Sequence, residues 1–336
     1  MAIDTESVLQ ELLGEELDTE PTTTRGLTNH LPMALVAKQR LGASADELRR
    51  FARIYSKKLA PLSDTSRGLD RSTWETAIGD SAAAAELREY FARCIADDGI
   101  EATLRLHLPF LIPGLGGAGF HGVIRLAYGI ESSSPPQIAA GLAYFAEVAR
   151  PLSQLTPTTN VTDDPKELLT GLSTALKHST PTRLRLIDDE MRLATSFEHF
   201  DQVVGSLAVG KSTEESLAQL ALHLYASTND FTALHGVTGL AALSIVRRWI
   251  DDQELIDRFA FQALIAAHIS IGAPALWSPD RLDELVESAP VTPETVGSMA
   301  AGSDDEHIAK FAYTAIQGFE RTSNPLYLVA ASRPAL

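Results

Sequence analysis

Four of the nine histidines in this 336-residue chain lie on apolar stretches with helical periodicity. A buried imidazole needs partners for both ring nitrogens, so a histidine on an apolar helix face requires an explanation. Neutral imidazole is also the commonest metal ligand, and a helical bundle can direct side chains from several helices to one point. The four internal histidines are therefore the first candidates for chemistry: His30, His121, His235 and His268.

For any one of these residues, a satisfied core histidine is the simplest explanation, whereas four on separate helices suggest a shared purpose. Their spacing is non-local, and the chain has no His-Glu-x-x-His motif, so spacing alone does not establish a metal site. The remaining histidines lie in polar or ambiguous surroundings, at His107, His178, His199, His223 and His307.

Lys310 is the only charged side chain between His307 and Phe319. A helical wheel places it opposite the apolar face, which predicts a lysine in solvent. The alternative is a helix covered on both sides, with Lys310 in a polar cavity, where desolvation lowers its pKa and favours the neutral amine. A neutral lysine can react with carbon dioxide to form a carbamate, which is a carboxylate-like metal ligand.

Helical periodicity dominates the segments that must position these groups. Residues 44–62 have an i, i+3, i+4, i+7 apolar stripe, and Ser44 and Glu47 have capping-box spacing. Alternating β-type runs are scarce, and the best one, residues 103–111, is interrupted by Pro109. We therefore expect an all-α protein of about a dozen helices with a central buried cavity for metal and substrate. The other segments with a helical pattern are residues 81–94, 120–131, 136–149, 166–177, 213–225, 233–249, 253–271 and 304–319.

One large helical domain is expected over residues 29–336, preceded by an N-terminal helix and loop over residues 1–28. Residues 150–165, rich in Thr, Pro and Asp, could divide two domains or form a surface linker. The single-domain interpretation is preferred because the candidate site draws on both halves of the chain.

The amino-acid composition restricts the classes of molecule that the protein is expected to bind and the compartment in which it is expected to lie. The chain has 28 Lys and Arg against 44 Asp and Glu, a net charge of −16, which disfavours nucleic acid and anionic membranes. Cys94 is the single cysteine, and the N-terminus does not resemble a secretory signal, so a cytoplasmic protein is expected. Two uncharged stretches, residues 106–124 and 259–279, are interpreted as buried helices rather than membrane spans. The oligomeric state is left open.

Residues 114–119 fit the G-x-G-x-x-G pattern of dinucleotide-binding loops. That motif needs a βαβ unit, and no second strand follows here, so a glycine-rich hinge between helices is the favoured interpretation. The alternative is an NAD(P)H-dependent reductase that uses this loop.

Several sequence blocks together resemble the questin oxidase-like family. They are TNHLPMALVA at residues 28–37, RLGAS at residues 40–44, FHGVIRLAYGIE at residues 120–131, LHGVT at residues 234–238, KFAY at residues 310–313 and NPLY at residues 324–327.

The resemblance implies an oxygenase. Fungal members open anthraquinone rings in aromatic polyketide pathways, by chemistry described as Baeyer–Villiger-type monooxygenation or as dioxygenase carbon–carbon cleavage. It also implies one non-haem Fe(II) held by four histidines and a carboxylated lysine, which fall on His30, His121, His235, His268 and Lys310. The partners would be O2 and a small aromatic substrate, with NADPH as a candidate reductant.

Two further residues follow His121 on the same helix stripe, Arg125 and Tyr128. They could orient a substrate phenolate or carbonyl, or form a structural salt bridge and hydrogen bond. The chain is shorter than the fungal enzymes, so the metal and reaction class can carry over without the anthraquinone substrate. A non-catalytic helical protein that binds a ligand and has lost the metal is the remaining alternative.

Overall fold

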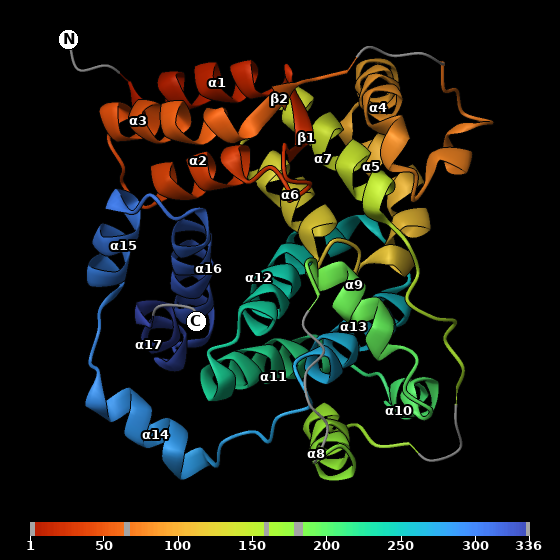
Figure 1. Ribbon diagram of the computed structural model, residues 1–336, viewed down its shortest axis with the longest axis vertical. Coiled ribbons are helices and arrows are strands. Elements are labelled where there is room, and N and C mark those ends of the chain that lie inside the picture. Colours follow the sequence, from red (N-terminus) through yellow and green to blue (C-terminus); the bar gives the residue numbers. More distant parts are fainter. Residues whose placement is uncertain (1–3, 64–67, 158–160, 178–183, 334–336) are drawn as a thin grey trace.

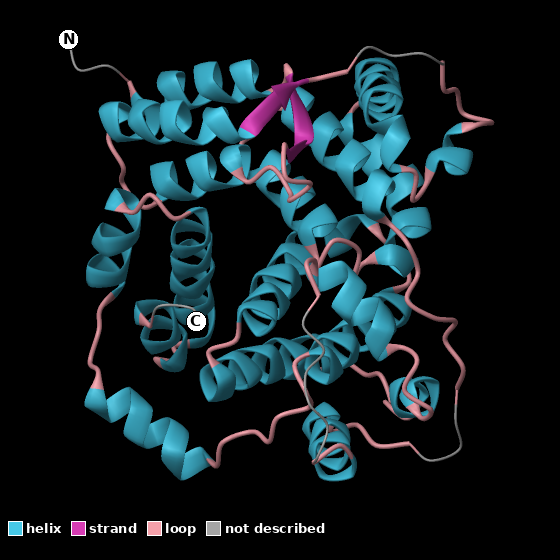
Figure 2. Ribbon diagram, viewed as in Figure 1, coloured by secondary structure: helices cyan, strands magenta, loops and turns pink. Residues whose placement is uncertain are grey.

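The computed structural model describes residues 4–63, 68–157, 161–177 and 184–333. Within these residues the chain folds into 17 α-helices and one small sheet (Figures 1 and 2). The expected all-α, single-domain fold is therefore confirmed. The helices outnumber the expected dozen because several are short, such as α10 (Phe200–Gly205) and α17 (Leu326–Ser332). His178, one of the histidines expected in polar surroundings, lies outside the described residues.

The first half of the chain contributes α1 (Thr5–Glu16), α2 (Leu31–Arg40), α3 (Ala45–Tyr55), α4 (Ala84–Asp98), α5 (Ile100–Leu111), α6 (His121–Glu131) and α7 (Pro135–Val148). The second half adds α8 (Pro165–Ala175), α9 (Ile187–Ala194), α11 (Thr213–Thr228), α12 (Phe231–Val246), α13 (Gln253–Ser270), α14 (Pro279–Ser288), α15 (Pro293–Gly302) and α16 (Glu306–Thr322). The 3-10 helices are η1 (Ser56–Lys58), η2 (Trp74–Ala77), η3 (Ser81–Ala83), η4 (Ile112–Gly114) and η5 (Arg247–Trp249).

The helix expected over residues 44–62 is shorter in the structure, and no strand forms over residues 103–111. The helix expected to run to residue 62 ends at Tyr55, and strand β2 (Leu59–Pro61) pairs antiparallel with β1 (Thr19–Thr23). The best β-type run is helical instead, because the buried residues of α5 include Leu104, Leu108 and Leu111, which recur with the helical period.

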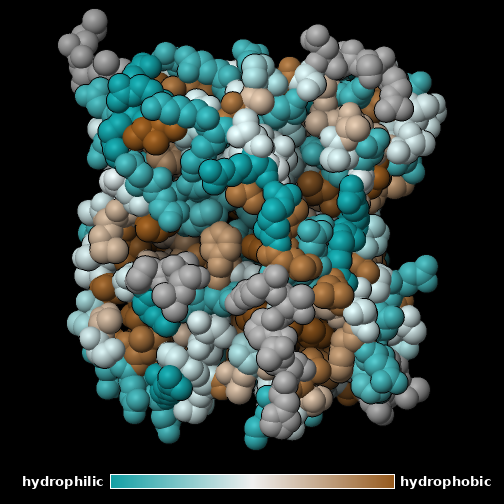
Figure 3. All heavy atoms as spheres, viewed as in Figure 1, coloured by the Kyte–Doolittle hydropathy of each residue, from teal (hydrophilic) through white to brown (hydrophobic). Residues whose placement is uncertain are grey.

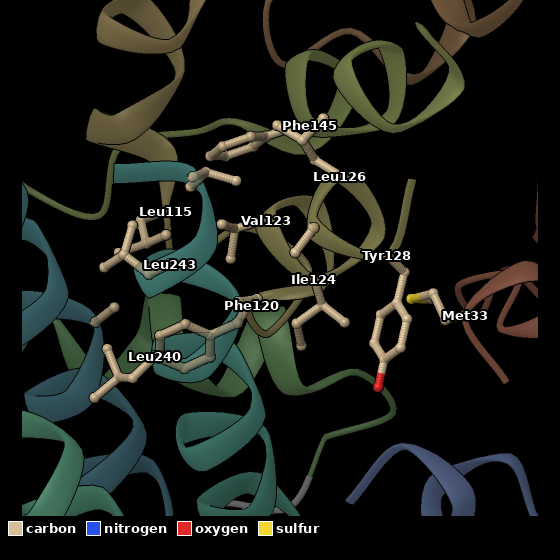
Figure 4. Packing of buried hydrophobic residues seen from close by; sticks show 14 of the residues in the cluster. Met33, Leu115, Phe120, Val123, Ile124, Leu126, Tyr128, Phe145, Leu240 and Leu243 are labelled. Atoms are coloured by element: carbon tan, nitrogen blue, oxygen red, sulfur yellow. The ribbon is translucent and has the colours of Figure 1, made fainter. Parts of the chain in front are cut away.

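Four helices, α2, α6, α12 and α16, pack against one another around the middle of the molecule (Figure 1). Glycines allow close approach between these elements. A Cβ atom on Gly239 of α12 would lie 2.6 Å from the Cβ of Phe120, the residue that precedes α6. Figure 4 shows Phe120 among the buried side chains of the core. On the other side of α6, a Cβ on Gly122 would lie 2.7 Å from the ring of Phe145 on α7. Any side chain larger than hydrogen would push these helices apart.

The glycine-rich segment, residues 114–119, connects η4 to α6 and follows a helix rather than a strand. A Cβ on Gly117 would lie 2.0 Å from the carbonyl oxygen of Val148 at the end of α7. Its glycines therefore permit close helix packing, and the described residues contain no βαβ unit around it. This supports the hinge interpretation over the dinucleotide-binding loop.

Burial separates the helical core from a polar surface. Residues 259–270, within the second uncharged stretch, belong to α13, and all of them except Ile269 are buried. Hydrophilic residues cover much of the face in Figure 3, and hydrophobic residues show between them. Among the described residues, no helix combines the length and the apolar character that crossing a bilayer requires.

Candidate metal centre

Four histidines meet where the N-terminal parts of four helices converge. His30 is the N-cap of α2, His121 is the first residue of α6, and His307 is the second residue of α16. His235 lies in the N-terminal part of α12. The positive end of a helix dipole disfavours a protonated imidazole, so this placement favours neutral rings that can act as ligands.

These four residues, hereafter the histidine cluster, form a closed ring of contacts. The ring centroids lie 4.7 Å apart for His30 and His121, 4.6 Å for His121 and His235, 5.6 Å for His235 and His307, and 4.6 Å for His307 and His30. The Nε2 atoms of His30 and His121 are 2.8 Å apart. The structure thus brings together three of the predicted histidines and adds His307.

Three of the rings have an acceptor beside Nδ1, so that Nε2 need not carry the proton. Nδ1 of His121 lies 2.5 Å from the Ala118 carbonyl oxygen, and Nδ1 of His235 lies 2.7 Å from that of Phe231. Nδ1 of His307 lies 3.2 Å from Oδ1 of Asp305. A ring that donates from Nδ1 to such an acceptor presents an unprotonated Nε2, the arrangement that metal-binding histidines adopt.

Two unpartnered nitrogen atoms make the histidine cluster suitable for binding an ion. Nε2 of His235 and Nδ1 of His30 are both buried, and neither has a hydrogen-bond partner among the described residues. Glu306 brings a carboxylate to the same place, with Oε1 3.8 Å from Nδ1 of His30 and 3.5 Å from Nζ of Lys58. Potential ligand atoms of His30, Glu306 and His307 all lie within 4.8 Å of one another. The donor set of neutral imidazoles and one carboxylate fits a divalent first-row metal.

The electrostatic environment keeps the imidazoles neutral. Burial lowers the pKa values of His30, His121 and His235 well below 6.5. Nearby positive charge lowers them further, chiefly from Lys310 for His30 and His121, and from His121 for His235. Burial and the charge of Lys310 also lower the pKa of His307. Neutral imidazoles can coordinate a metal without first losing a proton.

Lys310 is buried, with 3% of its surface exposed. The solvent-facing position that the helical wheel predicted is therefore wrong, and α16 is covered on both sides. The wheel failed because it describes one helix and not its neighbours, here α2 and α12. Burial lowers the pKa of Lys310 to about 7, against the opposing influence of Glu306 and Asp305. A large fraction of this amine is thus neutral at physiological pH.

His268 is also buried, but it lies away from the histidine cluster. Its Nε2 is 3.2 Å from Oγ of Ser173 on α8, and the backbone of Leu169 on the same helix is a second hydrogen-bond partner of the ring. Burial lowers the pKa of His268 to about 4, and no member of the cluster contributes to that shift. The expectation that His268 shares a site with the other three is therefore corrected: α13 directs it toward α8, where it is a core histidine.

Arg125 and Tyr128 make structural contacts, an ion pair and a hydrogen bond, as one of the two interpretations of the sequence expected. Nη2 of Arg125 lies 3.2 Å from Oε2 of Glu16, and both side chains are buried. The hydroxyl of Tyr128 is 3.5 Å from the backbone oxygen of Lys310, and the ring lies among core residues such as Met33 (Figure 4). Neither side chain lines the cavity that the four clustered histidines border, so the predicted contact with substrate is not supported.

The Arg125–Glu16 pair is nevertheless hydrogen-bonded to the segment that carries His30. Oε1 of Glu16 accepts a hydrogen bond from Nδ2 of Asn29 at 2.9 Å, and Asn29 precedes His30. Gln137 bonds both members of the pair. This buried network holds the turn that carries the first histidine of the cluster.

A cavity of about 1140 Å³ opens onto the histidine cluster, and all four histidines line it. Phe231 also lines it, with its ring edge-on to His235 at 4.6 Å and to His307 at 4.7 Å. Ligand pockets are typically about 300–1,000 Å³, so the cavity can hold a fused-ring molecule. Its lining has equal numbers of basic and acidic residues, unlike the acidic chain as a whole: the basic residues are Arg25, Lys57, Lys58, Arg150 and Arg185, and the acidic ones are Glu20, Glu147, Asp188, Glu190 and Glu306.

Sequence reasoning missed His307 and Glu306 because they stand in an acidic helix start that looks solvent-exposed. One signal was present. His307 precedes Lys310 by three residues, and that spacing places the two on the same helix face.

Comparison with known proteins gives a match over most of the chain. The family model described as questin oxidase-like matches residues 27–315, a range that includes the whole histidine cluster and Lys310. No curated protein matches the chain.

Proposed function

The chain belongs to the questin oxidase-like family, whose description implies an oxidoreductase, and from this premise we propose that it is a mononuclear non-haem iron oxygenase. Its substrate class would be aromatic, polyketide-like small molecules. The ligands would be His30, His121, His235 and His307, with Lys310 as the anionic ligand after carboxylation. This set keeps four of the five positions expected from the sequence and replaces His268 by His307.

The observation that carries the proposal is the separation of 2.8 Å between Nε2 of His30 and Nε2 of His121. Metal–imidazole bonds are about 2.0–2.1 Å long, so ligand atoms at right angles around one ion lie about 3 Å apart. Two nitrogen atoms at this distance can bind the same ion with little movement. The unpartnered Nε2 of His235 supplies a third donor in the same cluster.

Lys310 would supply the charge that four neutral imidazoles lack. With a pKa of about 7 it offers the neutral amine that reacts with carbon dioxide, and its carbamate would offset part of the charge of the metal. Glu306 is the alternative carboxylate, because its Oε1 lies 3.8 Å from His30.

Iron in such a site, when bound, supplies the redox chemistry that activates O2 toward an aromatic ring. The residues of the chain would hold the ligands neutral, seat the substrate in the cavity and limit the access of water. Phe231 would pack an apolar ring against His235 and His307. An apolar surround favours controlled oxidation because it excludes competing reactions with solvent.

Anaerobic reconstitution with Fe(II), followed by metal analysis and oxygen-uptake measurements, tests this function. We expect stoichiometric iron in the wild-type protein and little in His235→Ala. Oxygen uptake with a hydroxyanthraquinone would then depend on bound iron. Insertion of a single oxygen atom also consumes two electrons from a reductant such as NADPH, whereas dioxygenation does not, so uptake with and without NADPH separates the two reaction types.

Absence of iron binding would contradict the proposed function. A correctly folded wild-type protein that binds no iron after reconstitution would favour a helical ligand-binding protein without a metal. Zinc or nickel in the purified protein would not decide the matter, because imidazole sites bind these ions at least as tightly as Fe(II).

A further inference from the structure

One carboxyl group in the cavity wall has no part in the proposed metal chemistry. Glu147 lies on α7, is 5% exposed and lines the same cavity as the histidine cluster. Its Oε2 atom is enclosed and has no hydrogen-bond partner among the described residues. Buried polar groups in folded proteins are nearly always bonded, so this carboxyl is suited to a partner that enters the cavity.

Two hydroxyl groups lie in the same part of the wall. Tyr144 precedes Glu147 by three residues, one turn along α7, and also lines the cavity. Its hydroxyl is 2.7 Å from Oγ1 of Thr28, and Thr28 is two residues before His30. We call Glu147, Tyr144 and Thr28 the α7 polar wall. It extends from α7 to the segment that carries the first histidine of the cluster.

The charged groups around Glu147 favour its protonated form. Burial raises the pKa of Glu147 to about 8. The negative charges of Glu20 and Asp80 add to this shift, and the positive charges of Arg88 and Arg150 oppose it without cancelling it. A protonated carboxyl can donate a hydrogen bond, which an ionised carboxylate cannot do.

We propose that Glu147 is a substrate-binding residue that donates a hydrogen bond from its carboxylic acid to a carbonyl oxygen of an aromatic ketone or quinone in the cavity. The inference rests on the proposed function, because it takes this cavity as the substrate site. The hydroxyl pair of Tyr144 and Thr28 would bond a second oxygen on the same ligand edge. The α7 polar wall would then orient the ring system relative to the histidine cluster.

Binding of fluorenone and fluorene to the metal-free protein tests the inference. Both are tricyclic and free of titratable groups, and only fluorenone has a carbonyl. We expect the wild-type protein to prefer fluorenone, and Glu147→Leu to weaken fluorenone binding about two- to tenfold while leaving fluorene unchanged. Glu147→Gln should retain the preference because its amide can donate. The infrared carbonyl band of bound fluorenone should lie lower in the wild type and Glu147→Gln than in Glu147→Leu.

Glu131 provides a matched control. It is a half-buried acid whose pKa is also raised by burial, but Tyr313 and Gln317 already bond it and it does not line the cavity. Glu131→Gln should therefore leave fluorenone binding and the carbonyl band unchanged. Equal fluorenone affinity and an identical carbonyl band in the wild type and Glu147→Leu would overturn the inference.

The fluorenone experiment and the iron-binding experiment can each contradict one claim without affecting the other. Fluorenone binding is measured without metal, and iron binding is measured without fluorenone. Normal iron binding in a wild-type protein whose fluorenone affinity is insensitive to Glu147 would remove only the substrate contact. Absence of iron binding alongside a Glu147-dependent carbonyl shift would remove only the iron chemistry.

Discussion

His307 and Lys310 lie three residues apart on α16, and the positive charge of Lys310 lowers the pKa of His307. The same charge acts on His30, His121 and His235, which come from three other helices. A single turn of α16 thus places a histidine in the cluster and a lysine beside it. The two residues can be tested separately, because His307 is expected to bind iron directly and Lys310 is expected to act after carboxylation.

Removing the imidazole of His307 should abolish tight iron binding, whereas removing that of His268 should not. His307 completes the ring of contacts around the site, and His268 bonds Ser173 on α8 instead. We expect His307→Ala to lower the iron content after anaerobic reconstitution at least tenfold, roughly the loss that even outer-shell changes cause at metal sites. Metal analysis of His268→Gln, whose fold is checked by circular dichroism, is the control. The reverse pattern would restore the ligand set expected from the sequence.

Carboxylation of Lys310 should be visible directly. Because its pKa is about 7, the amine is substantially neutral near neutral pH and can react with carbon dioxide. Protein reconstituted in ¹³C-bicarbonate should show a carbamate carbon resonance by NMR, and Lys310→Ala should lack it. Added propionate should restore part of the iron affinity of Lys310→Ala by supplying a carboxylate. Full iron binding by the wild type without a carbamate resonance would assign the anionic position to Glu306 instead.

Glu147→Gln should change how stability depends on pH. The folded-state pKa of Glu147 is about 8 against an ordinary value of 4.5, so the folded form holds a proton that the unfolded chain releases. The stability that this group contributes is present below pH 4.5 and is lost as pH rises toward 8, by up to about 1.4 kcal/mol per pH unit. Urea unfolding of the metal-free proteins at several pH values should show the glutamine variant gaining relative stability across that range. A difference independent of pH would contradict this assignment.

The Arg125–Glu16 pair should be a stability determinant and not a substrate contact. Breaking a buried ion pair leaves one charge uncompensated, so Arg125→Met should lower the free energy of unfolding by roughly 3–5 kcal/mol. The double variant Glu16→Gln/Arg125→Met should recover part of this loss because no charge is left unpaired. Denaturant unfolding of the metal-free single and double variants measures both effects. A variant of normal stability that loses only fluorenone binding would return Arg125 to the substrate site.

Much of this fold can be predicted from sequence because helical periodicity is a local property. The apolar stripe on residues 44–55 and the capping box at Ser44 specify α3 without reference to the rest of the chain. The same local reasoning placed His30, His121 and His235 on buried faces, since an imidazole among apolar neighbours is visible in the sequence itself.

The choice among the remaining candidates depended on how helices from distant parts of the chain meet. His268 and His307 each lie on a helix, and only packing decides that α13 directs one toward α8 while α16 brings the other to His30. Lys310 looked exposed on its own helix and is buried because α2 and α12 cover that side. Periodicity tells which faces of a helix are apolar, whereas the convergence of side chains is a property of the assembled core, which no single helix contains.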